Sequence, residues 1–404
     1  MNIAVLHSGN AGFFPRYYCA LVSAAQTEGN EIALFSPNSG RNRRNRLPCQ
    51  ITWGTRLNWF VHSRLYKLTG MEDVFSFWET MALLFKLEKY VPDVIHLNLV
   101  NDKIINMPLF TYYVNKRNIP VVWTMHDCRA FTGGCPYFDE IGCDRWKTGC
   151  GQCKQSKTWI DGTHIVWKIR RRWHAGIKNL TIVTPSEWLA SFVRESFLGK
   201  HPIKVIYNGV DTTSFSKPSN LDVRSKYNIA NNKKIVLGCA INWEARKGLH
   251  FFETLADMLP SDYQIVLVGG IDAIRQGRLK KKGVICTGRT STLDEMVAWY
   301  QRASVFCNPT LADNFPTTNI ESLAAGTPIV TFRTGGSPET VDDKTGIVIE
   351  QGNIQALSEA VQTICEHRDR YTSDACYTRS QMFSDVNYKE YIKLFYSVKI
   401  FFDE

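Results

Sequence analysis

Short runs of Val, Ile and Leu alternate with segments of helical period along most of the 404-residue chain. Continuous apolar runs are typical of strands buried on both faces of a parallel sheet. The expected strands are Ile3–His7, Glu31–Phe35, Val94–Leu97, Val121–Thr124, Thr181–Thr184, Lys204–Ile206, Ile235–Cys239, Gln264–Val268, Val284–Thr287, Val305–Asn308 and Ile329–Thr331. Helices between them would complete βαβ units, so the pattern predicts an α/β protein.

The alternating pattern occurs twice, and the turn-rich stretch Asn208-Gly209-Val210-Asp211 lies near the break. We therefore expect two doubly wound, Rossmann-like domains with parallel sheets, at residues 1–205 and 206–384. Residues 385–404 have a helical period with Tyr388, Tyr391 and Phe395 on it. This predicts a C-terminal helix that packs back on the N-terminal domain.

The composition is that of a globular protein, with 44% hydrophobic and 21% charged residues. This excludes a disordered, collagen-like or coiled-coil chain. No stretch approaches the roughly 18 apolar residues of a membrane-spanning helix, and the apolar start Ile3-Ala4-Val5-Leu6 is too short for a signal peptide. We expect a cytoplasmic protein.

The net charge of +10 lies entirely in the first half of the chain. Residues 1–200 hold 25 Lys and Arg against 15 Asp and Glu, whereas residues 201–404 hold 23 of each. A positive field attracts phosphorylated lipids, an anionic membrane face or nucleic acid. The alternative is a basic surface that serves only solubility.

A segment near residue 170 interleaves basic and aromatic residues, Trp167-Lys168-Ile169-Arg170-Arg171-Arg172-Trp173. On a helix it could rest against an anionic membrane that presents a lipid-linked acceptor. This favours a protein that associates with the inner face of the membrane. The alternative is a helix packed by its two tryptophans, with the arginines in solvent.

Five of the twelve cysteines fall between residues 128 and 153. Without a secretory signal such a cluster suggests a metal before it suggests disulfides. We predict that Cys135, Cys143, Cys150 and Cys153 bind a structural Zn²⁺ within a cysteine-rich insertion at 128–153. Reduced core thiols, or disulfides formed after isolation, are the alternatives.

Candidate phosphate-binding residues follow the expected strand that ends at Cys239. Arg246-Lys247-Gly248 precedes the apolar helical segment Leu249–Leu259. Two cations and a glycine at a helix start suit a diphosphate. A solvated basic turn is the alternative reading.

A second loop of this kind follows the expected strand Val305–Asn308. It carries Asp313, and a helix is expected to open near Thr318 with Glu321 in its first turn. Ligands of doubly wound sheets bind beyond the carboxyl ends of the strands, where free N–H groups meet phosphate and a carboxylate can hold ribose hydroxyls. Thr318 and Glu321 could instead form a capping box.

Together these motifs resemble the retaining glycosyltransferases of family 4, which have the GT-B fold. The resemblance rests on Asp313, seven intervening residues and Glu321, with Gly326-Thr327-Pro328 behind them. It extends over nearly the whole chain, through Asn208–Asp211, Arg246–Gly248, Val266–Gly269, Gly335–Glu339 and Thr124–Cys128. The stretches Phe131–Cys135 and Trp146–Cys150 resemble the bacterial branch that builds surface polysaccharides.

The resemblance implies that the two domains face each other across a cleft, with the acceptor on the first and a nucleotide-diphosphate sugar on the second. It implies catalytic roles for His126, Lys247 and Asp313. The donor-binding residues that it implies are Gly12, Arg246, Lys247, Asn314, Phe315, Pro316, Thr317, Thr318 and Glu321. The sequence departs from the usual family pattern in three places. Asp313 stands where Glu is usual, Ile241 stands where Arg is common, and the loop motif Gly9-Asn10-Ala11-Gly12 lacks a tandem glycine.

The function expected from the resemblance is retaining transfer of a sugar to a glycan or lipid-linked acceptor in bacterial surface polysaccharide synthesis. The sequence contains no D-x-D triplet, so we expect no cofactor in catalysis, with cations and helix N–H groups stabilising the leaving diphosphate. One alternative is a nucleotide-sugar epimerase of the same fold. Another is a nucleic-acid-binding zinc protein, although the neutral second half does not favour nucleic acid as a partner.

Overall fold

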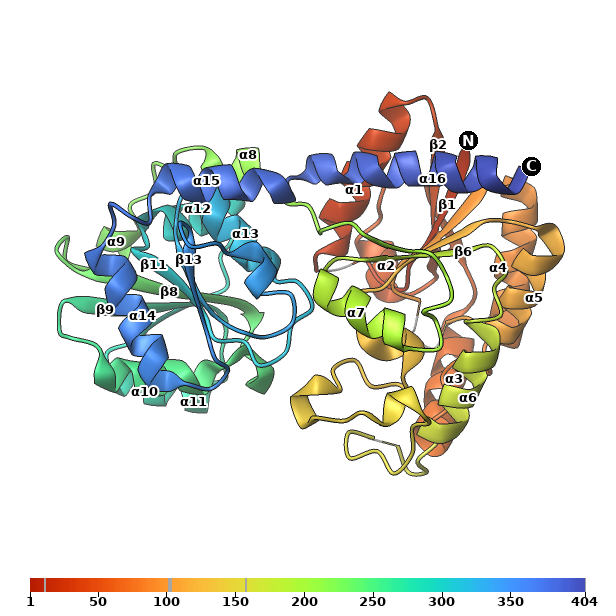
Figure 1. Cartoon of the computed structure of the whole chain (residues 1–404), viewed down its shortest axis with the longest axis horizontal. Coiled ribbons are helices and arrows are strands. Elements are labelled where there is room, and N and C mark those ends of the chain that lie inside the picture. Colours follow the sequence, from red (N-terminus) through yellow and green to blue (C-terminus); the bar gives the residue numbers. More distant parts are fainter. Residues whose placement is uncertain (11, 101–103, 157, 404) are drawn as a thin grey trace. The chain divides into compact units, whose positions relative to one another are not determined.

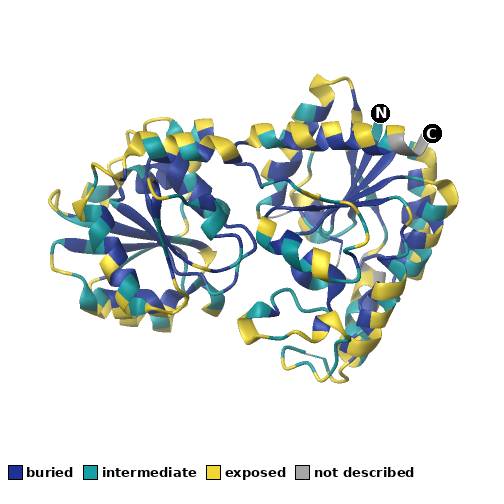
Figure 2. Ribbon diagram, in the orientation of Figure 1, coloured by how far each residue is buried: buried dark blue, intermediate teal, exposed yellow. Residues whose placement is uncertain are grey.

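The computed structural model describes residues 1–10, 12–100, 104–156 and 158–403, which form two compact units (Figure 1). Unit 1 consists of Met1–Tyr207 together with Val386–Glu404, and unit 2 of Asn208–Asp385. Each unit has its own parallel sheet with buried strands, and the outer faces of its helices are exposed (Figure 2). The α/β class with two doubly wound domains is therefore confirmed.

The sheet of unit 1 has seven parallel strands in the order β3-β2-β1-β4-β5-β6-β7. They are β1 Asn2–Leu6, β2 Glu31–Pro37, β3 Gln50–Trp53, β4 Val94–Leu97, β5 Val121–Thr124, β6 Leu180–Thr184 and β7 Ile203–Val205. The order reverses between β1 and β4, which pair directly. This reversal is the switch point at which doubly wound sheets bind ligands.

Helices cover both faces of this sheet because the strand side chains alternate between two cores. Ile3 and Val5 point into a core shared with α1, whereas Ala4 and Leu6 point into a core shared with α4 and α5. The helices of unit 1 are α1 Phe14–Thr27, α2 Gly40–Arg44, α3 Arg56–Thr69, α4 Phe77–Tyr90, α5 Met107–Arg117, α6 Thr163–Trp173, α7 Glu187–Glu195 and α16 Tyr388–Asp403.

The C-terminal helix α16 belongs to unit 1 and lies beside α1 (Figure 1). The ring of Tyr388 meets that of Tyr17 with centroids 4.9 Å apart, and the Tyr391 hydroxyl accepts a hydrogen bond from Thr124 at the end of β5. The aromatic residues that gave this segment its helical period are therefore buried against the sheet.

The sheet of unit 2 has six parallel strands in the order β10-β9-β8-β11-β12-β13, with the reversal between β8 and β11. The strands are β8 Lys234–Asn242, β9 Tyr263–Gly270, β10 Ile285–Gly288, β11 Val305–Asn308, β12 Ile329–Phe332 and β13 Gly346–Ile349. The helices are α8 Thr212–Ser216, α9 Val223–Lys226, α10 Leu249–Met258, α11 Ala273–Lys281, α12 Leu293–Arg302, α13 Thr317–Ala324, α14 Ile354–Glu366 and α15 Ser373–Ser380.

Two edge strands were not predicted from the hydrophobic pattern. β3 and β13 each end a sheet, and the two middle residues of each are only half-buried. An edge strand has a neighbour on one side only, so it lacks the continuous buried run that marks a central strand. The predicted strand Lys204–Ile206 is present as β7, the opposite edge of the first sheet.

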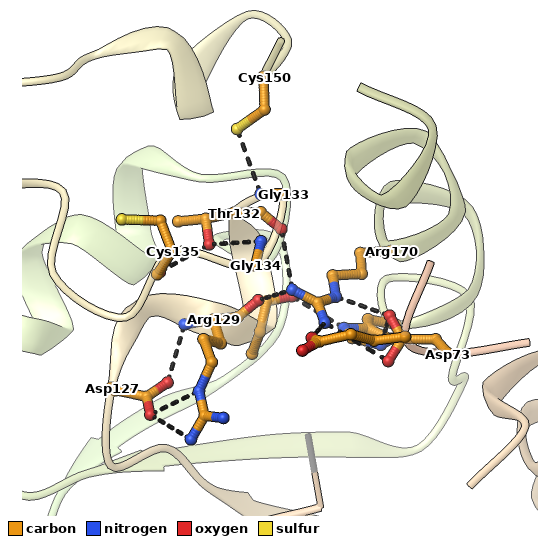
Figure 3. Close-up of polar contacts among 12 residues, drawn as sticks. Asp73, Asp127, Arg129, Thr132, Gly133, Gly134, Cys135, Cys150 and Arg170 are labelled. Carbon is orange, nitrogen blue, oxygen red and sulfur yellow. Dashed lines mark hydrogen bonds and ion pairs between the residues drawn. The ribbon is translucent and has the colours of Figure 1, made fainter. Parts of the chain in front are cut away.

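A buried ion cluster fixes the insertion that follows β5 (Figure 3). The guanidinium of Arg170 on α6 is fully buried and lies 2.7 Å from carboxylate oxygens of both Glu72 and Asp73. It also donates to the carbonyls of Arg129 and Thr132 at 2.5 and 3.1 Å. A buried cation needs such complete pairing, and Arg170 thereby ties α6 and the residues before α4 to the insertion.

Helix α6 is packed into unit 1 by one of its tryptophans. Trp167 is buried, and its indole donates to the Trp146 carbonyl at 2.7 Å. With Arg170 also buried, Lys168, Arg171 and Arg172 are the cations that this helix exposes. Trp167 thus packs the helix, as the alternative interpretation expected. The exposed side of the helix is mainly basic. Within the described ranges, none of the helices has both the length and the hydrophobicity needed to cross a bilayer.

Histidines of unit 1 whose pKa is lowered by burial, among them His96, His126 and His174, make its stability depend on pH. Burial lowers the pKa of His96 to about 3 and that of His174 to about 4. As the pH falls below about 6.5, the unfolded chain protonates these rings while the folded protein does not. We expect each histidine to lower the free energy of unfolding by about 1.4 kcal/mol per pH unit between pH 6.5 and its folded pKa.

Urea unfolding at several pH values in this window checks the expectation. The His174→Gln variant should show a shallower dependence on pH than the wild type, because one of the histidines with a lowered pKa is gone. Parallel curves for the two proteins would contradict the assignment.

Candidate active site

The candidate donor site of unit 2 lies at the carboxyl ends of β8 and β11, on either side of the switch point. β8 leads into the short 3₁₀ turn Ala245–Lys247, and β11 leads through a loop to α13. The two segments are joined by a hydrogen bond from the Leu311 amide to the Arg246 carbonyl at 2.7 Å. A ligand at this edge would meet both loops at once.

Gly248 allows the close approach of these loops. Its φ is +75°, in the left-handed region that favours glycine, and a Cβ there would overlap the carbonyl oxygen of Pro309. The preceding cations are therefore held against the loop that follows β11.

The two predicted cations converge on the predicted carboxylate. The ammonium of Lys247 lies 2.5 Å from Asp313 Oδ2, and the Arg246 guanidinium lies 4.0 Å from the same atom. Arg246 also donates to the Ala312 carbonyl at 3.0 Å. These three side chains are partly buried. The Arg246 guanidinium is also paired with Glu244, at 3.1 Å, so the two cations face two carboxylates. Glu244 is the more exposed of these two carboxylates.

Helix α13 presents its amino end at this place. It begins at Thr317 after Pro316, without a side-chain cap, so the first N–H groups of the helix and its dipole favour an anion. The capping-box alternative is wrong, because Thr318 is the second residue of the helix and not its cap. Glu321 falls one residue beyond the first turn.

The carboxylate of Glu321 accepts a hydrogen bond of 3.0 Å from the hydroxyl of Tyr300 on α12. Burial raises the pKa of Tyr300, so its hydroxyl keeps the proton that it donates. Sequence reasoning missed Tyr300, since nothing in the pattern of α12 distinguishes a tyrosine facing Glu321 from an ordinary core aromatic residue.

Glycines behind the site support the loop that carries Asp313. The Gly336 amide donates to the Asn314 carbonyl at 2.9 Å, and Gly335 adopts φ +54° where a Cβ would overlap the Asp313 carbonyl oxygen. The side chains of Asn314, Phe315 and Pro316 are buried. These predicted donor-binding residues thus lie in the loop that Gly335 and Gly336 support.

Unit 1 carries the two other predicted residues, His126 and Gly12, at the carboxyl edge of its own sheet. Gly12, with φ +66°, forms the turn before α1; Ala11 of the same motif lies outside the described residues. His126 follows β5, and its Nε2 donates to Oδ1 of Asn98 at 2.8 Å. Burial lowers the pKa of His126 to about 4, so the ring is neutral near pH 7.

Asn98 is a second residue that sequence reasoning missed. It is 2% exposed, follows β4 directly, and uses its carbonyl oxygen to fix the ring of His126. Its place directly after the predicted strand Val94–Leu97 was a signal in the sequence, but the pairing of β4 with β5, which brings Asn98 to His126, came from the structure.

A pocket of about 700 Å³ opens at the same edge of unit 1. Ser8 and Gly9 after β1 form part of its wall, together with Arg41 of α2 and the aromatic rings of Trp59 and Phe60 on α3. The pocket combines a cation, backbone polar groups and apolar surface.

The four predicted zinc ligands surround a smaller pocket of about 230 Å³ but do not converge on one point. The Cys135 thiol donates to Gln155 at 2.5 Å. The Cys150 sulfur accepts from the Gly133 amide at 3.2 Å (Figure 3). In the described part of the chain no three His, Cys, Asp or Glu side chains could hold a metal ion. The expected zinc ligand set, which includes Cys143 and Cys153, is thus not formed here.

The thiols of this insertion are reduced, as are all the chain's cysteines. Burial raises the pKa of Cys135 to about 12 and that of Cys150 to about 11, so these two are thiols and not thiolates. Among the three interpretations of the cysteine cluster, the structure agrees with reduced thiols packed in the insertion.

Comparisons with known proteins identify the family. The model described as Glycosyltransferase Family 4 matches residues 15–214, and that described as Glycosyl transferases group 1 matches residues 232–367. The chain belongs to glycosyltransferase family 4. The fold is GT-B, as the resemblance implied, and glycosyltransferases of this type need no catalytic cofactor.

Relatives of this family 4 glycosyltransferase share modest identity with it. It is 22% identical to WcaC of Escherichia coli K12, a glycosyl transferase assigned to colanic acid biosynthesis, over 73% of this chain and 75% of WcaC. It is 27% identical to a GDP-mannose-dependent phosphatidylinositol monomannoside mannosyltransferase of Mycobacterium tuberculosis, over 51% of this chain and 57% of that protein. The second match thus spans little more than half of the relative.

Solved structures share the fold across nearly the whole chain. HepE of Anabaena, solved in complex with UDP, superposes with a TM-score of 0.69 at 14% identity, and the match covers 98% of this chain and all of HepE. HepE has also been solved in complex with UDP-glucose. At this identity the likeness establishes the fold of the glycosyltransferase and no more.

The support that Gly335 gives to the Asp313 loop predicts a binding defect. In Gly335→Ala the new methyl group must displace the Asp313 carbonyl and strain the backbone, which shifts the loop. We expect affinity for a nucleoside diphosphate to fall by about tenfold, measured by calorimetry.

Gly352→Ala is the matched control, because Gly352 also has a positive φ, +83°, but open space around its Cβ position. It should lose stability without losing affinity. Equal affinity losses in both variants would contradict a specific role for Gly335.

Proposed function

We propose that this family 4 glycosyltransferase moves a sugar, with retention of configuration, from a nucleotide-diphosphate sugar to a glycan or lipid-linked acceptor in bacterial surface polysaccharide synthesis. The observation that carries the proposal is the convergence of Lys247, Arg246 and the uncapped amino end of α13 at the switch point of unit 2. The colanic acid assignment of WcaC and the complex of HepE with UDP support the pathway and the donor class.

In the proposed complex the diphosphate takes the place of Asp313 as partner of Lys247 and Arg246. The exchange of one anion for another keeps both cations paired and leaves Asp313 beside the transferred sugar. Backbone amides between Asn314 and Thr318 contact the sugar and the phosphates, and Glu321, oriented by Tyr300, accepts hydrogen bonds from the ribose hydroxyls.

The chemistry asked of these groups is electrostatic. Breaking the bond between the anomeric carbon and the diphosphate leaves an oxocarbenium-like sugar and a leaving group that gains negative charge. Fixed cations and N–H donors stabilise that charge as it develops. The leaving phosphate accepts the acceptor's proton in the proposed reaction, so no side chain is assigned as general base.

Unit 1 contributes the acceptor site in this proposal, with Gly12 against the diphosphate and His126 against the transferred sugar. A neutral His126 has its Nε2 proton engaged by Asn98, which leaves Nδ1 as an acceptor for a sugar hydroxyl. The enzyme is proposed to work in the cytoplasm at the inner face of the membrane.

The role of Lys247 predicts selective loss of diphosphate affinity. In Lys247→Ala we expect the affinity for a nucleoside diphosphate to fall by about tenfold to a hundredfold, because a charge-assisted contact is lost. Affinity for the nucleoside alone should change little. Calorimetry with the nucleotide selected by a thermal-shift panel measures both.

Lys281→Ala is a control, since Lys281 lies exposed on α11 of the same unit. Near-normal sugar transfer by Lys247→Ala would contradict the proposed mechanism. If the enzyme consumed the donor without an acceptor and formed an epimer, the result would favour the epimerase function instead.

The hydrogen bond between Asn98 and His126 predicts a change in the pH profile. We expect His126→Ala to lower kcat by about a hundredfold with donor affinity unchanged. Asn98→Asp places a carboxylate beside the ring, which favours the imidazolium. The acid limb of its activity profile should therefore move to higher pH than in the wild type.

His201→Ala is the control for loss of a histidine, because His201 precedes β7 at the opposite edge of the sheet. An unchanged pH profile in Asn98→Asp, with His126→Ala still inactive, would show that Asn98 does not set the state of the ring.

A further inference from the structure

Helix α3 turns its apolar side chains outward. Leu57, Phe60, Val61 and Leu68 are all exposed, and their spacing of three, four and seven residues places them on one face of the helix. The inward side instead carries His62, which is 1% exposed and contacts Ser76. A surface helix of a soluble domain has the opposite arrangement.

The next helix, α4, has a similar exposed stripe. Phe77, Trp78, Met81 and Phe85 lie in solvent, with Trp78 77% and Phe85 61% exposed. Leu83 and Leu87 supply its packing against the sheet. The exposed apolar side chains of α4 thus do not take part in its packing against the sheet.

The two helices adjoin at the 700 Å³ pocket of unit 1. Trp59 and Phe60 of α3 line it together with Ser76 and Glu79 at the start of α4. At the other end of α3, the amide of Trp159 donates to the Lys67 carbonyl, and the Trp159 side chain is 87% exposed. We call these exposed side chains of α3 and α4, with Trp159, the outer apolar face.

Cations accompany the outer apolar face. The Arg64 guanidinium lies 4.9 Å from the centre of the Phe60 ring, and the Lys89 ammonium lies 4.5 Å from that of Phe85. Arg41 of α2 lines the same pocket as Phe60. On α2 and just after it, Arg43, Arg44 and Arg46 are also exposed.

Nearby carboxylates offset only part of this charge. Glu79, which accepts hydrogen bonds from the amide and hydroxyl of Thr55, keeps its negative charge beside Arg41, and Glu88 is paired with Arg117 at 2.8 Å. The face therefore combines exposed aromatic rings with basic side chains, the composition of segments that lie in the interface of an anionic bilayer.

We propose that the outer apolar face of α3 and α4, with the arginines of α2, docks this protein on an anionic phospholipid membrane. Aromatic and aliphatic side chains would enter the headgroup region, and the arginines would contact lipid phosphates. The pocket shares Trp59, Phe60 and Arg41 with this surface, so a lipid-linked acceptor could enter it from the membrane. Only that last point rests on the proposed function.

This surface differs from the one that the sequence suggested. Helix α6 exposes Lys168, Arg171 and Arg172 but buries Trp167. Of its large apolar side chains it exposes Ile165, at 52%, and part of Trp173, so its exposed surface is mainly basic. Both surfaces would respond to anionic lipid, but only the outer apolar face would lose binding when aromatic side chains are removed.

Sedimentation with vesicles tests the proposal without measuring activity. The full chain is mixed with vesicles of phosphatidylcholine alone, or of phosphatidylcholine with phosphatidylglycerol. We expect binding to the anionic vesicles, a loss of at least about fivefold in a Trp78→Ser, Phe85→Ser double variant, and a loss of about fivefold for each arginine of α2 changed to Gln. Ile274→Ser is the control, because Ile274 is also 77% exposed but lies on α11.

Quenching of tryptophan fluorescence by brominated lipid gives a second readout, which does not depend on how tightly the protein binds the vesicles. Vesicles carrying bromine on the acyl chains should quench wild-type fluorescence, and the quenching should fall in Trp59→Phe, Trp78→Phe while sedimentation persists. This variant keeps aromatic side chains, so a loss of quenching reports the position of the two indoles.

Three results would overturn the proposal. The first is failure of the wild type to bind anionic vesicles at low salt. The second is loss of binding when Lys168, Arg171 and Arg172 are changed to Gln, with the Trp78 and Phe85 variant unaffected. The third is a dimer in solution that Trp78→Ser dissociates, which would assign the face to a second copy of the chain. Sugar transfer in detergent-free solution stays a separate measurement, so failure of docking and failure of the proposed function are distinguishable.

Discussion

The ion pair between Lys247 and Asp313 joins the two loops on which the candidate donor site of unit 2 is built. One loop follows β8 and the other follows β11, and these strands are neighbours at the point where the sheet order reverses. The hydrogen bond from Leu311 to Arg246 and the left-handed Gly248 bring the loops close enough for the pair to form. An anionic ligand would compete with Asp313 for cations that are partly buried and already in place, which lowers the cost of organising them.

Unit 1 depends on a different ionic interaction. Arg170 is fully buried and satisfied by two carboxylates and two carbonyls, so it ties helix α6, the residues before α4 and the insertion into one body. Loss of one partner would leave a buried charge unpaired, which is far more costly than loss of a surface ion pair. The basic run around residue 170 therefore serves two purposes, since one arginine holds the fold while its neighbours face solvent.

The apolar residues of the chain divide in the same way between structure and surface. Those of the central strands and of α16 are buried in two cores on either face of the first sheet. Those of the outer face of α3 and α4 remain in solvent beside a large pocket, with arginines next to them. Because clustered exposed apolar side chains mark interaction surfaces, the proposed membrane docking would account for residues that packing does not use.

The sequence by itself determined the α/β class, the central strands and the residue types of the candidate site. Runs such as Val94–Leu97 report burial on both faces, which is a local property of the chain, and motifs such as Arg246-Lys247-Gly248 carry their chemistry in adjacent residues. The edge strands β3 and β13, whose middle residues are half-buried, were not predicted.

Only the tertiary structure decided which distant side chains meet. The pairing of Lys247 with Asp313, of Tyr300 with Glu321 and of Asn98 with His126 depends on strand order and loop path. The same holds for the cysteines, whose spacing suited zinc but whose thiols point to Gln155 and Gly133. Spacing along a chain limits which groups can approach one another, whereas the direction of each side chain is set by the packing around it.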